Sequence, residues 1–276
     1  MALDPTRTKV LRRRFMQDAA RRFRKLQKAV ITLIVTDDAF GLEEEKPFKF
    51  NARKQYKFLT DNQKVKQFRI WLQTQIDAGL LEVVGGVEGQ PWTAQYVESV
   101  YRKGMMRAYT DTHKETLSES PAWYRGTQEQ FVRDAFLQPE MLSKVQLLNT
   151  RTFEGMKGVT ESVGTQLNRL LAEGLVNGRG PKVVAREIKK AIPKLKNRAL
   201  TIARTEIIHA HAEGQLDAFK MLGIEEVGAE VEFSTANDAL VCPICYDLEG
   251  KVYKVKDAHG IIPVHPRCRC GWKPNV

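Results

Sequence analysis

The sequence predicts a mainly α-helical protein with a small α+β cap at its C-terminus. Two observations lead to this fold class. Long stretches before Gly223 carry apolar side chains at the three- and four-residue spacing of amphipathic helices. After Gly223 the pattern changes to strand-like alternation, and all four cysteines lie in this last part. A composition of 42% apolar and 28% charged residues over 276 residues is that of a globular protein with one large domain or two ordinary ones.

The first predicted element is a basic amphipathic helix that continues to Val35. Between Arg7 and Lys28 the chain has ten basic residues and one acid, Asp18, which gives +9 of the total formal charge of +11. Residues 1–40 are therefore predicted to form a basic helical arm. Its apolar stripe is Leu11, Phe15, Ala19, Phe23, Leu26 and Val30.

Charge this one-sided is costly without a partner, which favours a surface that contacts phosphates or an acidic protein. The alternative is a solvated helix face with no partner. The candidate contact residues are Arg12, Arg13, Arg14, Arg21, Arg22, Arg24, Lys25 and Lys28.

Residues 41–152 are predicted to form a helical domain. It opens with an irregular charged segment, Glu43–Phe58, that is typical of a linker or long loop. The longest apolar run of the chain, Ala29–Val35, lies before it and is far too short to span a bilayer. A turn-rich passage is expected over Ser118–Gly126. Helices are expected over Asp61–Ala78, Trp92–Thr110, Thr127–Leu137 and Pro139–Asn149.

Residues 153–276 are predicted to form a C-terminal domain. Its helices are expected over Thr160–Val176, from Pro181 to a stop at Pro193, and over Asn197–Leu222. The glycines between the first two indicate a tight turn. A DNA-reading helix-turn-helix has this pattern, but a plain helical hairpin is the more frequent cause. Strands are expected at Val227–Phe233 and Lys251–Tyr253, so the cap covers about residues 227–276.

The cysteines form one cluster with a histidine, Cys242-Pro-Ile-Cys245 and then His265-Pro-Arg-Cys268-Arg-Cys270. This spacing is typical of a structural zinc site, which needs four of these five ligands and would staple the cap. The preferred set is Cys242, Cys245, His265 and Cys268. The alternative pairs Cys268 with Cys270 and leaves His265 outside. A disulfide or plain reduced thiols are the other interpretations, and the lack of an opening signal peptide disfavours the disulfide.

One motif has a partial likeness to an enzyme. His211-Ala-Glu213 ahead of Cys242-x-x-Cys245 resembles the signature of zinc deaminases. However, Pro243 follows the first cysteine instead of preceding it, and the triplet falls in the middle of a predicted helix. No phosphate-binding glycine loop or serine–histidine–aspartate set is recognisable. We therefore expect that the protein is not an enzyme, with a zinc-dependent deaminase or hydrolase as an alternative.

Taken in order, the motifs of the C-terminal half resemble the Mu F-like family of tailed-bacteriophage minor head proteins. The resemblance covers about Phe153 to Trp272, and one departure is Phe233, where the family commonly has tryptophan. The motifs are Leu170-Leu-Ala-Glu-Gly-Leu-Val-Asn-Gly178, Val183-Val-Ala-Arg-Glu-Ile188, Ala203-Arg-Thr-Glu206, Gly214, Phe233-Ser-Thr235, Asp238, Cys242-x-x-Cys245, Gly250-Lys-Val-Tyr253 and His265-Pro-Arg-Cys268-Arg-Cys270.

The resemblance implies a structural protein of the virion head near the portal, made in the host bacterial cytoplasm. The implied partners are the portal protein, the major capsid or scaffold protein and double-stranded DNA bound without regard to sequence, but no membrane. Head assembly, DNA packaging and ejection are the implied processes. The alternative from another class is a cellular nucleic-acid-binding protein that uses the basic helix and a zinc ribbon.

Overall fold

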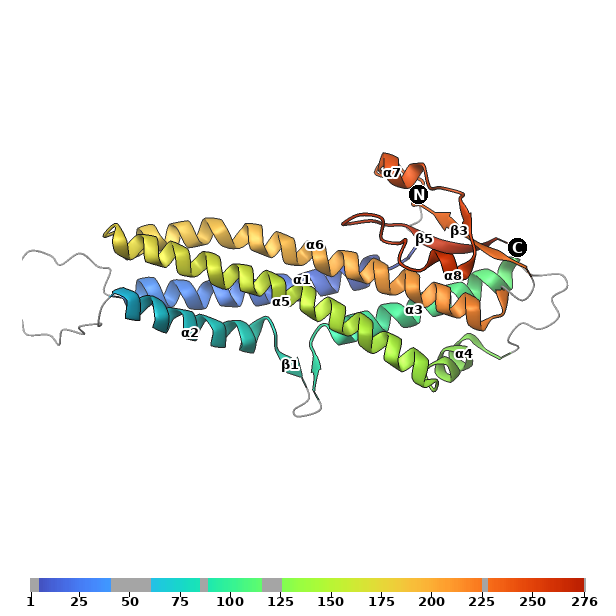
Figure 1. Cartoon of the computed structure of the whole chain (residues 1–276), viewed down its shortest axis with the longest axis horizontal. Helices are drawn as coiled ribbons and strands as arrows, with labels where there is room; N and C mark the ends of the chain where they lie inside the picture. The colour runs from blue at the N-terminus through green and yellow to red at the C-terminus, as the bar shows by residue number, and fades with distance from the viewer. Residues whose placement is uncertain (1–4, 41–60, 85–88, 116–125, 225–227, 276) are drawn as a thin grey trace, which may run out of the picture. The chain divides into compact units, whose positions relative to one another are not determined.

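The computed structural model describes residues 5–40, 61–84, 89–115, 126–224 and 228–275 (Figure 1). Helices dominate, and a small antiparallel sheet lies near the C-terminus, so the predicted fold class is confirmed. The helices are α1 (Lys9–Ile31) with a π-helical turn η1 (Thr32–Thr36), α2 (Asp61–Gly79), α3 (Ala94–Glu115), α4 (Gln128–Ala135), α5 (Pro139–Val176), α6 (Pro181–Met221), α7 (Pro243–Tyr246) and α8 (Val255–Ala258). The strands are β1 (Val83–Val84), β2 (Gln90–Pro91), β3 (Glu230–Ser234), β4 (Val252–Tyr253) and β5 (Gly271–Asn275).

The chain divides into two compact units that are each assembled from separate segments. Unit 1 comprises Met1–Met16, Gln90–Phe153 and Thr201–Val276, and unit 2 comprises Gln17–Gly89 and Glu154–Leu200. Helices α1, α5 and α6 therefore contribute to both units. The predicted division into residues 1–40, 41–152 and 153–276 follows the order of the chain and stays a prediction.

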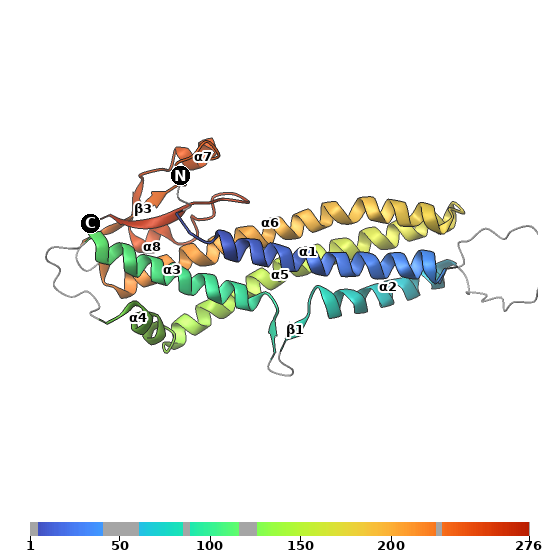
Figure 2. The same cartoon turned by 180° about the vertical axis from the view of Figure 1, so that it is seen from behind.

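Unit 2 consists of four helical segments, from α1, α2, α5 and α6, that lie side by side (Figure 2). Arg22 of α1 donates to the carbonyl oxygen of Gly79 at the end of α2, at 2.6 Å. The apolar stripes of all four segments supply the core, and the stripe predicted for α1 is buried from Phe15 onward. The core side chains of this unit are Ala19, Phe23, Leu26, Val30, Ile34, Phe68, Leu72, Ile76, Val159, Val163, Leu167, Leu171, Val184, Ile188, Ile192 and Ala199.

A tight turn joins α5 to α6 within unit 2. Gly178 has a φ of +59° and donates to the carbonyl of Leu175, and Arg179 donates to the carbonyl of Gly174 at 2.8 Å. This pair of hydrogen bonds is the Schellman arrangement, which favours glycine at its left-handed position. The predicted helical hairpin is confirmed.

In unit 1, helices α3 and α6 approach closely at two glycines. A Cβ atom on Gly104 would overlap the carbonyl oxygen of His211, and one on Gly214 would overlap the carbonyl oxygen of Tyr101. Helix α4 begins with a complete capping box, in which Thr127 and Gln130 exchange side-chain and backbone hydrogen bonds. Because α3 and α6 pack so closely, they form a rigid support for the cap that follows α6.

The cap sheet has the order β4-β3-β5, with both pairings antiparallel. Val231 of β3 lies opposite Tyr253 of β4, and Phe233 lies opposite Trp272 of β5. Phe233 and Trp272 meet edge to face with ring centroids 5.7 Å apart. The two predicted strands are present, with β3 ending one residue later than expected. Strand β5 was not predicted.

Two predicted helix breaks are wrong. Helix α5 runs without interruption from Pro139 to Val176, and α6 passes through Pro193. A proline inside a helix removes one backbone hydrogen bond and costs about 3 kcal/mol. The neighbours Ile192 and Leu195 are 2% and 8% exposed, so burial of this face offsets the loss. In α5 the buried positions Met156 and Val159 continue the apolar stripe past Gly155 and Gly158.

The remaining expectations are limited by what is described. The linker over residues 43–58 lies outside the described residues, as does most of the turn-rich passage over 118–126. Helices predicted from Asp61 and from Trp92 correspond to α2 and α3. Within the described ranges, no helix combines the length and apolarity that a membrane crossing requires.

Candidate metal centre

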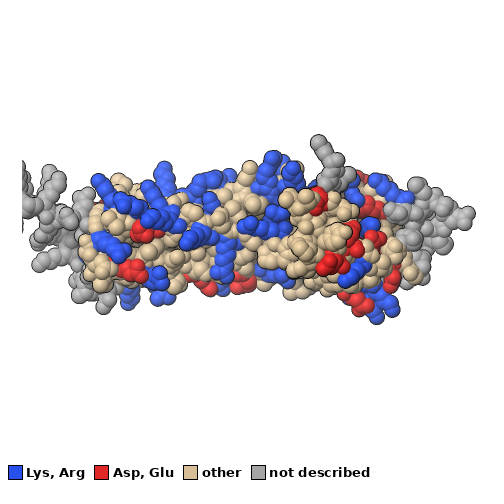
Figure 3. Space-filling model, turned by 90° about the horizontal axis from the view of Figure 1, so that it is seen from above, with Lys and Arg blue, Asp and Glu red and all other residues tan. Residues whose placement is uncertain are grey.

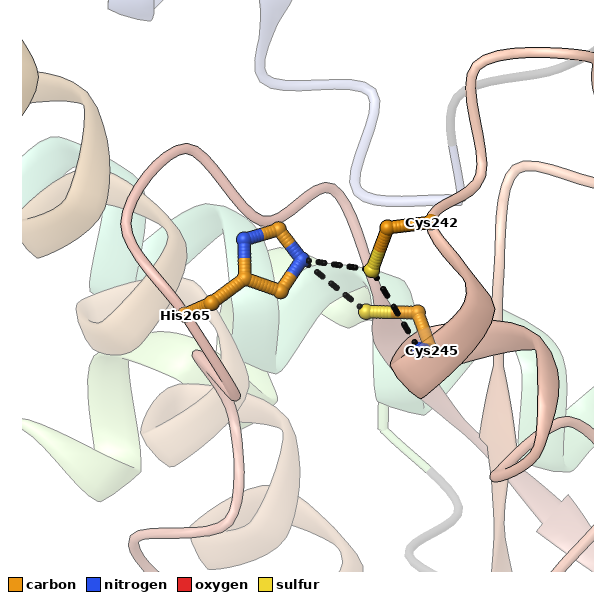
Figure 4. A group of neighbouring side chains, drawn as sticks. All are labelled: Cys242, Cys245 and His265. Atoms are coloured by element: carbon orange, nitrogen blue, oxygen red, sulfur yellow. Dashed lines mark hydrogen bonds between the residues drawn. The ribbon is translucent and has the colours of Figure 1, made fainter.

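The first half of the cysteine cluster is a knuckle at the start of α7. Cys242 is the N-cap residue, and its Sγ accepts a hydrogen bond from the backbone N–H of Cys245 at 3.4 Å. Pro243 occupies the first turn of the helix, where no backbone N–H is needed. This local geometry turns both thiol groups toward the same side (Figure 4).

The second half is the loop that leads into β5. Arg267 adopts a φ of +69°, and the N–H of Cys268 donates to the carbonyl of His265 at 3.1 Å. Arg267 also donates from its backbone N–H to Thr205 of α6 at 3.2 Å. This turn directs the imidazole of His265 and the thiol of Cys268 toward the knuckle.

The structure brings all five predicted ligands into two overlapping groups. Nε2 of His265 lies 3.2 Å from Sγ of Cys242 and 3.2 Å from Sγ of Cys245 (Figure 4). Sγ of Cys245 lies 4.0 Å from Sγ of Cys268. Cys245, Cys268 and Cys270 form the second group, with sulfur atoms all within 4.8 Å of one another. The four cysteines are free thiols, and this cluster could hold a metal ion.

The thiols differ in acidity because they are buried together. A hydrogen bond from Cys270 lowers the pKa of Cys268 to about 5. Burial raises the pKa of Cys245 to about 12. The hydrogen bond with Cys268, followed by burial, raises the pKa of Cys270.

Two carboxylates hold the loops around the cluster. Asp238 accepts two hydrogen bonds from the guanidinium of Arg269, at 2.7 and 2.5 Å, which lowers the pKa of Asp238. Glu249 accepts from the backbone N–H of Thr235 at 2.6 Å. Both contacts link the knuckle side of the cap to the strands that flank the cluster.

Side chains of α6 attach the cap to the helices of unit 1. The amide of Gln215 donates to the carbonyl of Trp272 at 2.7 Å and accepts from its N–H at 3.1 Å. Glu213 accepts from His259 Nδ1 at 2.7 Å and from the N–H of Gly260 at 3.0 Å. Both α6 side chains are almost fully buried, so these polar contacts determine where the cap lies on the helix.

A charged network continues from Glu213 into the helices. Nζ of Lys144 lies 3.2 Å from Glu213 and 2.7 Å from Asp217, and Asp217 also accepts from the hydroxyl of Tyr101 at 2.5 Å. Burial raises the pKa of Glu213, but the hydrogen bond from His259 and the charge of Lys144 outweigh it and lower this pKa to about 2. Burial, followed by the charge of Asp217, raises the pKa of Tyr101.

The deaminase arrangement is not formed by the described residues. Neither His211 nor Glu213 belongs to a group that could hold a metal. His211 is fully buried in α6. Glu213 already accepts hydrogen bonds from His259 and Gly260 and forms an ion pair with Lys144. A carboxylate committed to these partners contributes to docking the cap.

The eight candidate cations of α1 fall into two classes. Arg12 is 8% exposed, and Arg22 is half-buried, where it donates to Gly79 and Glu82 at 2.6 Å. Arg21 is exposed and pairs with Asp18. The exposed members are Arg13, Arg14, Arg21, Arg24, Lys25 and Lys28.

Sequence reasoning missed a second basic segment, at the start of α6. Its signal was present, because seven lysines and arginines follow one another at spacings of one to four residues from Lys182 to Arg198, opposite the apolar stripe. The net charge of the chain outside α1 is close to zero, because acidic residues elsewhere cancel the cations of α6. This sum therefore concealed the basic segment. The docking residues Gln215 and Lys144 carried no comparable signal, because their partners are distant in the sequence.

Comparison with known proteins gives one match. Residues 165–272 match the family model described as Phage Mu protein F like protein. No curated protein and no solved structure matches the chain. The matched range begins within α5 and ends in β5, and it includes every residue of the cysteine and histidine cluster. Over residues 165–272 the chain is therefore similar to the Mu F-like family that its motifs resemble.

Proposed function

We propose that this protein is a structural minor head protein of a tailed phage whose C-terminal cap is folded around one zinc ion. The Mu F-like match over residues 165–272 carries the proposal. The charged network of unit 1 supports a structural role, because Glu213, Asp217 and Lys144 are all engaged in contacts within the protein. The proposed partners are the portal protein and the major capsid or scaffold protein, in head assembly and in DNA packaging or ejection.

The ligand distances support a Cys₃His zinc site. Zinc bonds of about 2.3 Å to sulfur and 2.0 Å to nitrogen place tetrahedral ligand atoms roughly 3.5–3.8 Å apart. The separations from His265 to Cys242 and Cys245, at 3.2 Å, and from Cys245 to Cys268, at 4.0 Å, lie on either side of this range. Small side-chain movements would bring four atoms around one ion, which would supply folding energy to the cap.

Cys270 has a different proposed role. Its sulfur atom lies within 4.8 Å of the sulfur atoms of Cys245 and Cys268, but Cys270 is not in the group that contains His265. A thiol that donates to a ligating sulfur orients the ligand and tunes its basicity. We therefore assign Cys242, Cys245, His265 and Cys268 as ligands and Cys270 as their support.

A matched pair of variants tests the ligand assignment. Protein purified without chelator should contain about one zinc per chain by mass spectrometry of the metal. Cys268→Ser should lose most of this zinc, whereas Cys270→Ser should keep it with weaker affinity. Absence of zinc from the wild type, with four thiols that react freely in the folded state, would reject the metal. If Cys270→Ser loses its zinc and Cys268→Ser keeps it, Cys270 is the ligand in place of Cys268.

The head assignment is tested in virions. Chemical cross-linking of intact particles should join this protein to the portal protein, and the same particles should lack cross-links to tail components. We also propose that the exposed cations of α1 contact DNA or an acidic surface at this location. Substitution of Arg24, Lys25 and Lys28 by glutamine should reduce incorporation into heads. Normal incorporation of that variant would make this side of α1 a solvated face.

The non-enzymatic assignment has its own test. Glu206→Ala and Glu213→Ala should change folding or assembly only. Glu206 is 12% exposed at its side chain and pairs with Arg151 at 3.0 Å, which is a packing contact within unit 1. Release of ammonia from nucleosides by the wild type, lost in Glu213→Ala at unchanged stability, would show an enzyme.

A further inference from the structure

The first part of α6 has a basic face that the function of the cap does not use. From Lys182 to Arg198 the helix has seven basic residues and one acid, Glu187, which is a net charge of +6. All of these residues lie in unit 2. The basic residues are Lys182, Arg186, Lys189, Lys190, Lys194, Lys196 and Arg198.

The cations are gathered on one side of the helix. At 100° per residue, Lys182, Lys189 and Lys194 fall within an arc of roughly 140°. The buried side chains of the same stretch, including Ile188 and Ile192 at 0% and 2% exposure, point the opposite way. Figure 3 shows more lysine and arginine than acidic side chains over the helical end that includes this part of α6.

Carboxylates of the described residues do little to neutralise this face. Glu187 forms an exposed pair with Lys190 at 3.0 Å, with side chains 66% exposed at lysine and 37% at glutamate. A pair in such a setting is worth only about 0–1 kcal/mol. Lys182, Arg186, Lys189 and Lys194 are all exposed, and their repulsion is relieved when an anionic partner binds.

The spacing of the cations suits a polyanion with repeated charges. Lys182 and Arg198 are sixteen residues apart, or about 24 Å along the helix at 1.5 Å per residue. That length corresponds to roughly seven base pairs of duplex DNA at 3.4 Å each. Because the helix is a continuous rigid element, the cations are held in line without an ordering cost for the backbone.

The chemistry of the face favours nucleic acid over protein. Protein interfaces are anchored by aromatic and large apolar side chains at their centre. The basic face has no aromatic residue between Lys182 and Arg198, and its exposed large apolar side chain is Val183 at 38%. Phosphate contacts need only flexible cations and no apolar anchor.

We infer that the basic face of α6 binds the phosphate backbone of double-stranded DNA without regard to sequence. This inference rests on the proposed head function for its biological setting. The DNA binding itself is a property of the purified protein. The occupant is a duplex backbone that lies along the exposed side of the helix in unit 2. No base contact is required, because the cations are all long side chains on one convex helix surface.

The test is DNA binding by the full-length protein, measured by fluorescence anisotropy with two labelled 20-base-pair duplexes of unrelated sequence. The variant carries Lys182→Gln, Arg186→Gln, Lys189→Gln and Lys194→Gln, and glutamine keeps helix propensity. We expect equal affinity of the wild type for both duplexes and at least a tenfold loss in the variant. The slope of log affinity against log salt should become shallower by about 0.9 for each contact removed.

A matched control neutralises four exposed lysines of unit 1, Lys220, Lys251, Lys254 and Lys256, in the same way. It should bind DNA nearly as well as the wild type. A second variant, with Lys182→Arg, Lys189→Arg and Lys194→Arg, keeps the charge and should keep the binding. Circular dichroism and zinc content show that each variant is folded.

Three results would overturn the inference. The first is that the α6 variant binds DNA as tightly as the wild type does. The second is that the unit 1 control loses as much affinity as the α6 variant, which would show that binding depends on overall charge and not on this face. Loss of cross-linking to the portal protein at unchanged DNA affinity would identify an acidic protein as the partner. Each of these outcomes leaves the zinc content and head incorporation to be judged separately, so the proposed function does not fail with the inference.

Discussion

Unit 2 and the C-terminal cap bury different kinds of groups. In unit 2 the interior is filled by apolar side chains such as Phe23, Leu72 and Leu167, which repeat along four helical segments. The cap also buries apolar side chains, such as Val231, Phe233 and Trp272, and it adds the thiols of Cys245, Cys268 and Cys270. Unit 2 is therefore stabilised by area removed from water, whereas the cap combines apolar burial with directional contacts around a candidate metal.

Because the two regions are stabilised differently, substitutions should affect their stability differently. Apolar packing is spread over many side chains, so that a single truncation removes a fraction of the stability. A metal site fails as a whole, because three ligands bind zinc far more weakly than four. Polar docking contacts such as those of Gln215 and Glu213 lie between these cases.

The largest effect should come from Cys245→Ser. Cys245 belongs to both ligand groups, so its loss leaves neither arrangement complete. Zinc binding contributes on the order of 10 kcal/mol in small zinc domains, and the cap should become sensitive to trypsin after Lys251 and Lys254. Peptide mapping measures this, and helices α1 and α2 should stay protected. A protected, zinc-loaded Cys245→Ser protein would contradict the proposed centre.

The next largest effect should come from Leu167→Ala in unit 2. Leu167 is fully buried in α5, and truncation of such a side chain costs about 2–5 kcal/mol. Urea unfolding followed by circular dichroism gives the change in free energy. The control is Val176→Ala in the same helix, where the side chain is 80% exposed and the change should be below about 0.5 kcal/mol. Equal effects at the two positions would disprove the packing described for this helix.

A pair of glycine substitutions compares close helix contact in the two units. Gly214→Ala should destabilise unit 1 by about 1–3 kcal/mol, because the new Cβ meets the rigid backbone at Tyr101. Gly158→Ala in α5 has nothing within 4 Å of the new atom and should stabilise its helix by about 0.5–1 kcal/mol. Thermal unfolding measures both, and a stabilised Gly214→Ala protein would refute the close approach of α3 and α6.

Another effect should be a pH dependence due to His209. Burial, followed by the charge of Arg151, lowers its pKa in the folded protein from 6.5 to about 4. The unfolded chain therefore binds more protons between these values, and stability is complete above pH 6.5 and falls as the pH is lowered toward 4. The loss should reach about 2–3 kcal/mol at most. His209→Gln should remove this part of the pH profile, and an unchanged difference between pH 7 and pH 4.5 would exclude the mechanism.

Sequence patterns predicted the helices well where the signal was local. The apolar stripe of α1 and the hairpin turn at Gly178 depend on residues three to five apart, which the sequence displays directly. Pro193 was misread as a break, and the continuity of α5 between Asn149 and Thr160 was missed, because the burial of neighbouring side chains outweighs local helix propensity. Strand β5 was missed since its residues, with Pro274 among them, alternate poorly and depend on pairing with β3.

The residue types of the metal centre and the amphipathic faces of the helices could be recognised without coordinates, because both arise from short spacings along the chain. Only the tertiary structure decided that His265 approaches Cys242 and Cys245, and that Glu213 meets His259 instead of joining the metal ligands. It also decided which cations of α1 are buried. These contacts join residues twenty or more positions apart, and their distances follow from packing of whole elements, which no local pattern encodes.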